Sequence, residues 1–299
     1  MLVPISEYLE AKFALDERSL NREVRAAFLD ALRGLPQIEC LDVGAGTGAT
    51  FRRLLQSGLT TPLSLTALDR DRGLLDIARQ DAEGWLRALG LEPRVEDGAI
   101  QTRGERLAAM RFATGELKDH RPDRLYNVIT AHAFLDLSPL PQALRQFAAW
   151  LEPGGYLYAS INYDGDTALA PSYQVATFEA TILRHYNDSM ELRRVDGQAT
   201  GGAYCGRRLQ ALLPDHAFDI VACGSSDWNI SPFEGEYRNS DAICLKALLD
   251  FIGCEGQRSK LLEADHLDRW RDDRLRSLQQ CRLGLRISHL DLLARYRPR

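Results

Sequence analysis

Three glycines alternate in the stretch CLDVGAGTGAT, where Gly44, Gly46 and Gly48 follow a short apolar run. A glycine-rich loop between a strand and a helix lets the backbone approach a ligand where any Cβ would clash, and the helix beyond it offers free N–H groups. Asp69 follows the next apolar run, and a carboxylate there can accept both ribose hydroxyls of a nucleoside. The pattern predicts a nucleoside-cofactor site. The alternative for Asp69 is an N-cap of the following helix.

A histidine and a run of three polar residues follow two later apolar stretches. His132 comes after LYNVITA, and Asn162, Tyr163 and Asp164 come after YLYASI. Because open α/β sheets bind ligands outside the carboxyl ends of their strands, these side chains are expected to face a substrate. His132, Tyr163 and Asp164 are candidates for a general base, with Asp136 as a further one, and Asn162 is a candidate substrate contact. The alternatives are a hydrogen-bonded structural histidine, a packed tyrosine and an ordinary turn at Asp164.

Aromatic residues are the other candidates for substrate contacts. Phe134 follows His132 by two positions, Tyr186 lies in the helical stretch YQVATFEATILRHYNDSM, and Trp228 lies in the polar loop GSSDWNISP. We expect these three side chains to line the substrate side of the site. Since aromatic residues at helical spacing more often belong to a core, packing is the alternative for Tyr186 and Trp228.

The elements that must position these residues alternate between strands and helices. Apolar, β-rich runs predict strands, and stretches with apolar residues at helical spacing follow them. This order is typical of an α/β fold with a doubly wound, mostly parallel sheet. The expected strands are the one that ends in the glycine loop, then 63–69, 108–113, 125–131, 156–163, a sixth in FDIVACGSSDW and a last one in GLRISHLDLLARY.

Helical regions and a hairpin add to this alternation. The start of the chain has helical apolar spacing, and Asp16 or Ser19 is expected to cap a second helix. Asp97-Gly98 predicts a β-hairpin before or merging with the third strand. Further helices are expected after the fifth strand. We predict a single elaborated domain in which residues 1–36 form a helical extension, 37–164 the cofactor-binding half, and 165–299 the acceptor-side half with a helical cover.

The composition limits the partners. The chain has 299 residues, 45% of them hydrophobic, and a formal net charge of −5. That balance gives no global attraction to nucleic acid or to an anionic membrane, so neither is expected as a partner. The six cysteines form no CxxC pair, so no metal site is expected and the thiols are expected to be reduced. With no signal peptide and no apolar run of bilayer length, we expect a cytoplasmic protein, a monomer or a homodimer.

The glycine pattern alone fits two nucleoside cofactors. Gly44, Gly46 and Ala49 satisfy the GxGxxG/A pattern of dinucleotide-binding proteins, so an NAD-dependent oxidoreductase is one alternative. Asp42, just before the first glycine, is unfavourable for a pyrophosphate but can pair with a cationic group of a ligand. The long helical start and the stretch LEPGG before the fifth strand also point away from NAD.

Four segments in this order, LDVGAGTG, LTALDRD, LYNVITAHAFLDL and LEPGGYLYASI, resemble the successive signatures of class I S-adenosylmethionine-dependent methyltransferases. The resemblance covers approximately residues 37–163. It implies a Rossmann-like, mostly parallel sheet of seven strands whose last strand is antiparallel. It also implies S-adenosylmethionine as the cofactor and S-adenosylhomocysteine as the product, and we expect a small-molecule acceptor for the methyl group.

The same resemblance implies roles for individual residues. Asp42 orients the ammonium group of the methionine part of the cofactor, and Asp69 holds the ribose hydroxyls. The loop residues under the methionine part are Gly44, Ala45, Gly46 and Gly48. The residues beside the adenine or the edge of the cofactor are Arg70, Glu116, Leu117 and Ala131.

The chain departs from the family pattern before the third signature. Glu116 stands where the family more often has Asp, and the hairpin at Asp97-Gly98 lengthens the stretch before it. The sequence contains neither an N/D-P-P-Y/F motif nor a Pro-Cys pair, so methylation of bases in nucleic acid is not expected. A SAM-binding protein without methyl-transfer activity is a further alternative. Oxygen, nitrogen and carbon are all open as the methylated atom.

Overall fold

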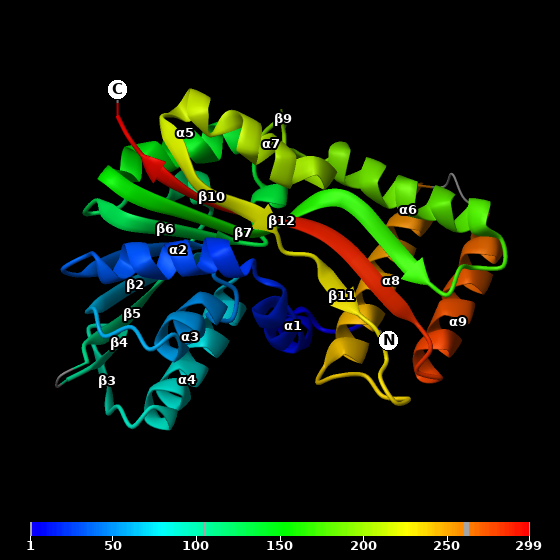
Figure 1. Cartoon of the computed structure of the whole chain (residues 1–299), viewed down its shortest axis with the longest axis horizontal. Coiled ribbons are helices and arrows are strands. Elements are labelled where there is room, and N and C mark those ends of the chain that lie inside the picture. Colours follow the sequence, from blue (N-terminus) through cyan, green and yellow to red (C-terminus); the bar gives the residue numbers. More distant parts are fainter. Residues whose placement is uncertain (1, 104–105, 260–262, 299) are drawn as a thin grey trace.

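The computed structural model describes residues 2–103, 106–259 and 263–298, and ten strands of these ranges form one sheet (Figure 1). The strands of this sheet are β1 (Ile38–Val43), β2 (Leu63–Asp69), β3 (Pro93–Glu96), β4 (Ala99–Thr102), β5 (Ala108–Thr114), β6 (Tyr126–His132), β7 (Leu151–Ala170), β10 (Phe218–Ser225), β11 (Trp228–Ile230) and β12 (Gly284–Tyr296). Their order is β3-β4-β5-β2-β1-β6-β7-β12-β10, and β11 pairs with β12. A separate hairpin joins β8 (Arg194–Val195) and β9 (Gln198–Ala199).

The directions of the strands confirm the predicted Rossmann-like fold. The strands β5, β2, β1, β6 and β7 are parallel neighbours, whereas β12 runs antiparallel to both β7 and β10. The sheet is larger than the seven strands expected, because the hairpin β3–β4 joins it through β4 and β5, and β11 is added at β12. Asp97 and Gly98 both have positive φ, as a tight hairpin turn requires.

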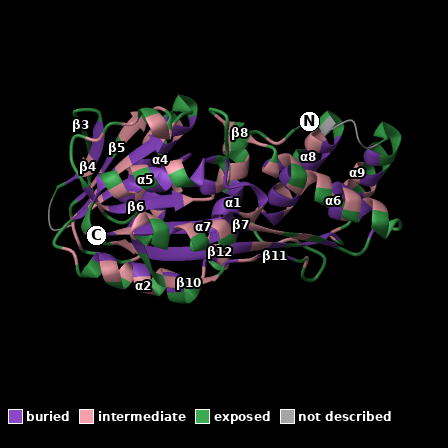
Figure 2. Ribbon diagram, turned by 90° about the horizontal axis from the view of Figure 1, so that it is seen from above, coloured by how far each residue is buried: buried purple, intermediate pink, exposed green. Residues whose placement is uncertain are grey.

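Helices cover both faces of the parallel part of the sheet. Along β1, Cys40 packs with Phe28 and Phe51 on one face, and Leu41 packs with Phe147 on the other. Figure 2 shows the central strands largely buried and the helices exposed along their outer sides. Within the described ranges, no helix combines the length and apolar composition needed to cross a bilayer. The helices are α1 (Ile5–Ser19), α2 (Arg22–Arg33), α3 (Ala49–Gln56), α4 (Arg72–Ala88), α5 (Leu140–Trp150), α6 (Ala176–Glu191), α7 (Cys205–Leu212), α8 (Asp241–Ser259) and α9 (Ala264–Gln279).

A second core lies where β7, β11 and β12 extend beyond the parallel strands. The helices α1, α6, α8 and α9 pack around this extension (Figure 1). A buried ion pair ties α6 to α9: Glu179 accepts hydrogen bonds from the Nε of Arg274 at 2.7 Å and from the indole N–H of Trp270 at 2.8 Å. The extension therefore supports a helical cover beside the carboxyl ends of the parallel strands.

Two expected boundaries are wrong. The fifth strand does not end at Tyr163: it continues as β7 to Ala170, because pairing with β12 extends as far as Gly284. Asp164 is thus inside a strand rather than in a turn. Asn21 caps α2 by accepting hydrogen bonds from the N–H groups of residues 23 and 24, whereas Asp16 is buried within α1.

Candidate functional site

A cavity of about 830 Å³ opens at the carboxyl ends of β1, β2 and β6. Its walls are the glycine loop, the start of α4, one side of α1 from Ile5 to Asp16, the segment after β6, and the hairpin that begins at β8. The volume is in the range of sites for small molecules and cofactors, roughly 300–1,000 Å³. The predicted residues Asp42, Gly44, Ala45, Gly46, Asp69, Arg70, Glu116, Leu117, His132 and Phe134 all line it.

The glycine loop forms part of the cavity wall. Gly44 has a φ of +66°, and a Cβ there would meet the ring of Phe134 at 2.3 Å. Gly48 has a φ of +84° but does not line the cavity, because its free side faces Met110, Ala78 and Trp85. The loop therefore needs Gly44 for its approach to Phe134, and Gly48 for the packing of the loop against α4 and β5.

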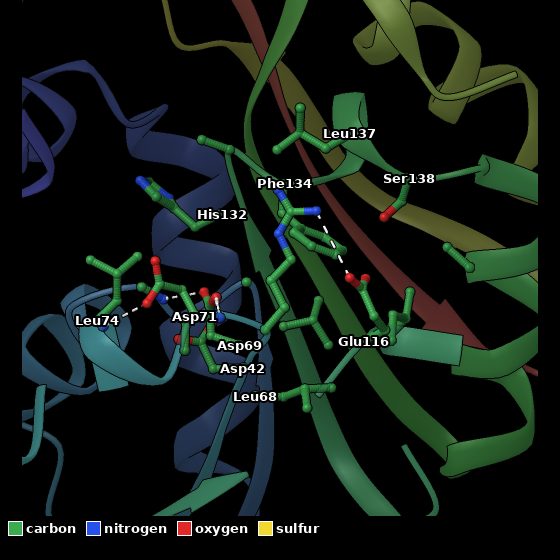
Figure 3. Close-up of a pocket in the computed structure, with 18 of the residues that line it drawn as sticks. Asp42, Leu68, Asp69, Asp71, Leu74, Glu116, His132, Phe134, Leu137 and Ser138 are labelled. Atoms are coloured by element: carbon green, nitrogen blue, oxygen red, sulfur yellow. Dashed lines mark hydrogen bonds and ion pairs between the residues drawn. The ribbon is translucent and has the colours of Figure 1, made fainter. Parts of the chain in front are cut away.

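Asp69 supports the glycine loop directly. One carboxylate oxygen accepts a hydrogen bond from the N–H of Gly46 at 2.8 Å, and the other accepts one from the N–H of Asp71 at 2.9 Å. The N-cap of α4 is Asp71, whose carboxylate accepts from the N–H of Gly73 and from the N–H of Leu74. Figure 3 shows Asp71 beside Leu74. A carboxylate has about four lone-pair sites, so Asp69 keeps acceptor capacity toward the cavity.

Asp42 is a buried acid in the same wall. Its carboxylate accepts a hydrogen bond from the hydroxyl of Thr130 at 2.6 Å. Burial raises the pKa of Asp42 to about 6, while the hydroxyls of Thr130 and Thr50 and the charge of Arg53 oppose this rise. A buried carboxylate without a cationic contact at its side favours a cation in the adjoining space.

Arg70 and Glu116 face each other across the cavity mouth. The guanidinium and the carboxylate are 3.8 Å apart, and both side chains are largely exposed. Ala131, in contrast, does not line the cavity: it is a residue of β6 that is buried in the core on the side of α5. The pair marks the open side of the site, where an exposed ligand edge would lie.

His132 stands at the end of β6 with both ring nitrogens engaged. Its Nε2 is 2.8 Å from the carboxylate of Asp16, and its Nδ1 is 2.7 Å from the hydroxyl of Ser160. Burial and the charge of Arg53 lower the pKa of His132 to about 3, and Asp16 acts in the opposite direction. The neutral ring donates its Nε2–H to Asp16, so its Nδ1 lone pair accepts from Ser160.

The N-terminal helix contributes to this part of the site, which was not predicted. Asp16 lines the cavity and is held by Lys12 at 2.6 Å and by the indole N–H of Trp228 at 3.0 Å. Although burial acts in the other direction, the charge of Lys12 and the hydrogen bonds from His132 and Lys12 lower the pKa of Asp16 below its ordinary value. Asp16 therefore remains ionised beside His132.

Several predicted residues lie outside the cavity lining. The hydroxyl of Tyr163 donates to Asn187 at 2.7 Å, Asp164 pairs with Arg207 at 3.0 Å, and Asn162 is buried and donates to a backbone carbonyl of β12. These contacts follow from the extension of β7, which carries the three side chains away from the glycine loop. Tyr186 also does not line the cavity, and neither does Trp228, which contacts two lining residues: it donates to Asp16, and the ammonium of Lys12 lies 5.6 Å from its ring centroid.

Other lining residues also escaped the sequence analysis. Thr47 and Thr50 stand in the glycine loop and at the start of α3, and Arg193, Arg194 and Asp196 come from the segment between α6 and β9. The threonines next to the glycines in the sequence could have been predicted as part of this lining. The spacing of Lys12 and Asp16, one helical turn apart on an apolar face, was a further signal, because charged residues on such a face are rarely left unpaired.

Known proteins resemble this chain in sequence and in fold. A family model described as a methyltransferase domain matches residues 15–195. A protein described as a methyltransferase from Bacillus halodurans aligns with a TM-score of 0.50 at 12% identity, over 91% of this chain and 98% of that one. A SAM-dependent methyltransferase from Thiobacillus denitrificans, solved with S-adenosyl-L-homocysteine, aligns with a TM-score of 0.47 at 15% identity, over 99% and 100% of the two chains. The Bacillus structure shares the fold.

A curated relative is much longer than this chain. A highly reducing polyketide synthase from Aspergillus terreus is 26% identical over 216 residues. The alignment covers 70% of this chain and 8% of the synthase. The chain thus spans less than a tenth of the length of the curated relative that it matches.

Proposed function

Because this chain belongs to the methyltransferase-domain family and is a SAM-dependent enzyme of that family, we propose that it methylates a small-molecule acceptor beside His132. The observation that carries this proposal is the cavity itself. The glycine loop and His132 line the same space of about 830 Å³, so a cofactor and an acceptor can meet there.

The residues of the cavity fit the cofactor. S-adenosylmethionine supplies an electrophilic methyl group on a positively charged sulfur. The ring of Phe134 lies so close to Gly44 that any side chain at position 44 would displace the ring and change this wall of the cavity. We assign Asp69 to the ribose hydroxyls, since its carboxylate keeps free acceptor sites, and Asp42 to the cationic ammonium group. Arg70 and Glu116 flank the exposed edge at the cavity mouth.

His132 is the residue that we assign to removal of a proton from the acceptor. The ring is neutral at physiological pH because its pKa is near 3, which also makes it a weak base, and its Nδ1 lone pair accepts from Ser160. To reach Nδ1, an acceptor O–H, N–H or activated C–H would have to displace the hydroxyl of Ser160, which is buried and does not line the cavity. Asp16 would then stabilise the imidazolium that forms. Asp16 is a weaker base still, because its pKa lies below its ordinary value and its carboxylate already bonds Lys12, His132 and Trp228.

Several lines support a small acceptor in the cytoplasm over the alternatives. The acceptor space lies between α1 and the segment after β6, with Ile5, Leu9 and Leu137 as apolar walls, which suits a molecule of modest size. All six cysteines are free thiols, which is typical of a reducing compartment. The match to a polyketide synthase makes polyketides a first group of acceptors to test.

A labelling experiment tests the proposal. The protein is incubated with methyl-labelled S-adenosylmethionine and a cell extract, and the label is measured in the small-molecule, protein and nucleic-acid fractions. We expect label in the small-molecule fraction and stoichiometric S-adenosylhomocysteine. Label confined to protein or nucleic acid would exclude a small acceptor. Cofactor binding without label in any fraction would favour a SAM-binding protein that transfers no methyl group.

The affinity for S-adenosylmethionine is expected to fall in acid. The pKa of Asp42 is near 6 in the protein, and the cationic cofactor prefers the ionised form. As the pH falls below about 6, Asp42 takes up a proton and affinity falls by up to about tenfold per pH unit. Calorimetric titrations between pH 5 and 8 check this result. In Asp42→Asn the affinity should be lower at every pH and should no longer fall below about pH 6. If the affinity of this variant still fell below about pH 6 as in the unmodified protein, Asp42 would not be the group that binds the ammonium.

A further inference from the structure

We propose that the acceptor carries an anionic group, a carboxylate or a phosphate, which Arg193 binds with support from Arg194. This inference rests on the proposed methyl transfer in the same cavity. It names the chemical class of the acceptor: a small molecule with an apolar body and an anionic end.

The distribution of charge in the cavity is the first observation. Three ion pairs neutralise many of the charged side chains that line it, namely Lys12–Asp16, Arg70–Glu116 and Lys118–Asp196. Among the described residues, the lining acids outside any ion pair are Asp42, Asp69 and Asp71, and the lining cations outside any ion pair are Arg193 and Arg194. The acids stand at the ends of β1 and β2, whereas the two cations follow α6.

These two sets of charges suit two different ligands. The acids lie beside the glycine loop, where the proposed function places the ammonium group and the ribose hydroxyls of the cofactor. The one anionic group of S-adenosylmethionine is its methionine carboxylate, which the N–H groups at the start of α3, beside the glycine loop, can bind without two guanidinium groups. The cations therefore fit a second molecule, and a planar guanidinium is well matched to a carboxylate or a phosphate because it can donate two parallel hydrogen bonds.

The backbone of this segment is held in place. The N–H of Arg193 donates to the carbonyl of Met190 at 3.1 Å, and its carbonyl accepts from Thr200 at 3.4 Å. Lys118 bonds Asp196 at 2.7 Å and so fastens the hairpin to the opposite wall. Arg194 donates one N–H group to the carbonyls of residues 191 and 193, which fixes its guanidinium while its other donors have no protein partner in the described structure.

Arg193 is half-buried, and its side chain has no hydrogen bond or ion pair with the described residues. The charge of Arg193 acts on Asp136, a half-buried carboxyl whose pKa burial raises to about 6 and Arg193 lowers. An alternative role for Arg193 is thus to stabilise the ionised carboxylate of Asp136 without direct contact. A half-buried guanidinium with all its donors free gains more from an anion at direct contact.

The apolar part of the acceptor follows from the neighbouring wall. Leu9, Ala133, Phe134 and Leu137 line the cavity near His132. An acceptor that reaches from Arg193 toward His132 would place its apolar part on these side chains. We therefore expect small aromatic or aliphatic acids and phosphates to bind, and uncharged analogues of the same shape to bind much more weakly.

Binding of three matched probes tests the inference. Benzoate, phenyl phosphate and uncharged benzamide are titrated into protein saturated with S-adenosylhomocysteine, and binding is followed by ligand-observed NMR. We expect at least one of the two anions to bind at least tenfold more tightly than benzamide. The better anion identifies the carboxylate or the phosphate as the group recognised. Equal binding of all three probes, or no binding of either anion, would overturn the inference.

Variants separate recognition from a structural role. Arg193→Gln should lose at least tenfold in affinity for the preferred anion and keep its benzamide and S-adenosylhomocysteine affinities, whereas Arg193→Lys should retain part of the anion affinity. Arg184→Gln removes an exposed arginine of α6 that does not line the cavity, and it should bind like the unmodified protein. A lower melting temperature of Arg193→Gln with unchanged anion affinity would assign Arg193 to Asp136 instead. Failure of S-adenosylhomocysteine to bind the unmodified protein would refute the proposed function, a result distinct from these.

Discussion

Replacement of His132 by alanine is expected to lower the turnover of methyl transfer at least a hundredfold while the affinity for S-adenosylhomocysteine changes less than threefold. A general base contributes roughly 10²–10⁴ to a rate, so loss of that role would account for a fall of this size. Asp16 keeps Lys12 and Trp228 as partners in this variant, so the fold is expected to survive. Steady-state kinetics with the acceptor found by labelling, and calorimetry with the product, measure the two quantities.

Two further variants distinguish a base from a structural histidine. Ser160→Ala removes the hydroxyl at Nδ1 and leaves the Asp16 contact, so turnover should be kept within a few-fold. Asp16→Asn removes the charge that favours the imidazolium, and turnover should fall by an amount between those of Ser160→Ala and His132→Ala. Equal losses of turnover and cofactor affinity in His132→Ala would show that the histidine only maintains the cavity.

Asp69→Ala is expected to weaken binding of S-adenosylmethionine and S-adenosylhomocysteine at least tenfold. A hydrogen bond to a charged group is worth about 1.5–3 kcal/mol, so even one lost ribose contact costs roughly ten- to a hundredfold. The variant also leaves the N–H of Gly46 without its acceptor, which loosens the loop. Calorimetric titration of S-adenosylhomocysteine gives the change in affinity directly.

Adenine serves as the probe that separates these two effects. If Asp69 binds the ribose, the variant loses affinity for S-adenosylhomocysteine and for adenosine but not for adenine. A loop that is merely loosened would lose affinity for all three. Asp76→Ala is the matched control, since Asp76 lies on the exposed face of α4, where it pairs with Arg72 at 3.9 Å, and does not line the cavity. Unchanged affinity of Asp69→Ala would refute the ribose assignment.

Much of the sheet could be predicted because its strands are bounded by local signals. The range 63–69 coincides with β2 and GLRISHLDLLARY coincides with β12. Each strand is an apolar run between polar or turn-forming residues, so its limits depend on the chain itself. The glycine loop and Asp69 were predictable for the same reason, since the loop and the end of β2 are read from short stretches.

The far end of β7 could not be predicted from its own residues. Asp164-Gly165 has the composition of a turn, and only pairing with β12 carries the strand on to Ala170. A strand end that depends on a distant partner leaves no mark in the local sequence. The prediction of Tyr163 and Asp164 as bases rested on the assumption that the strand ended there, and the extended strand places them elsewhere.

The acid beside His132 could not be predicted for a related reason. Asp16 is separated by 116 positions from His132 and by 212 from Trp228, and it joins both through hydrogen bonds. The spacing of Lys12 and Asp16 indicates a buried charged pair, but it does not show whether the acid reaches into a site. Only the packing of α1 against the extension of the sheet decides this.

The position of α1 also has a consequence for the order in which the protein matures. The ribosome produces Asp16, Arg18 and Asn21 early, but their partners Trp228, Asp241 and Asp291 follow 212, 223 and 270 positions later. Contacts of such long sequence separation form late because a large loop must close first. The glycine loop and its strands can therefore assemble during synthesis, whereas the surroundings of His132 are completed only when β12 has been made. A nascent chain that already has its glycine loop would still lack the finished acceptor site.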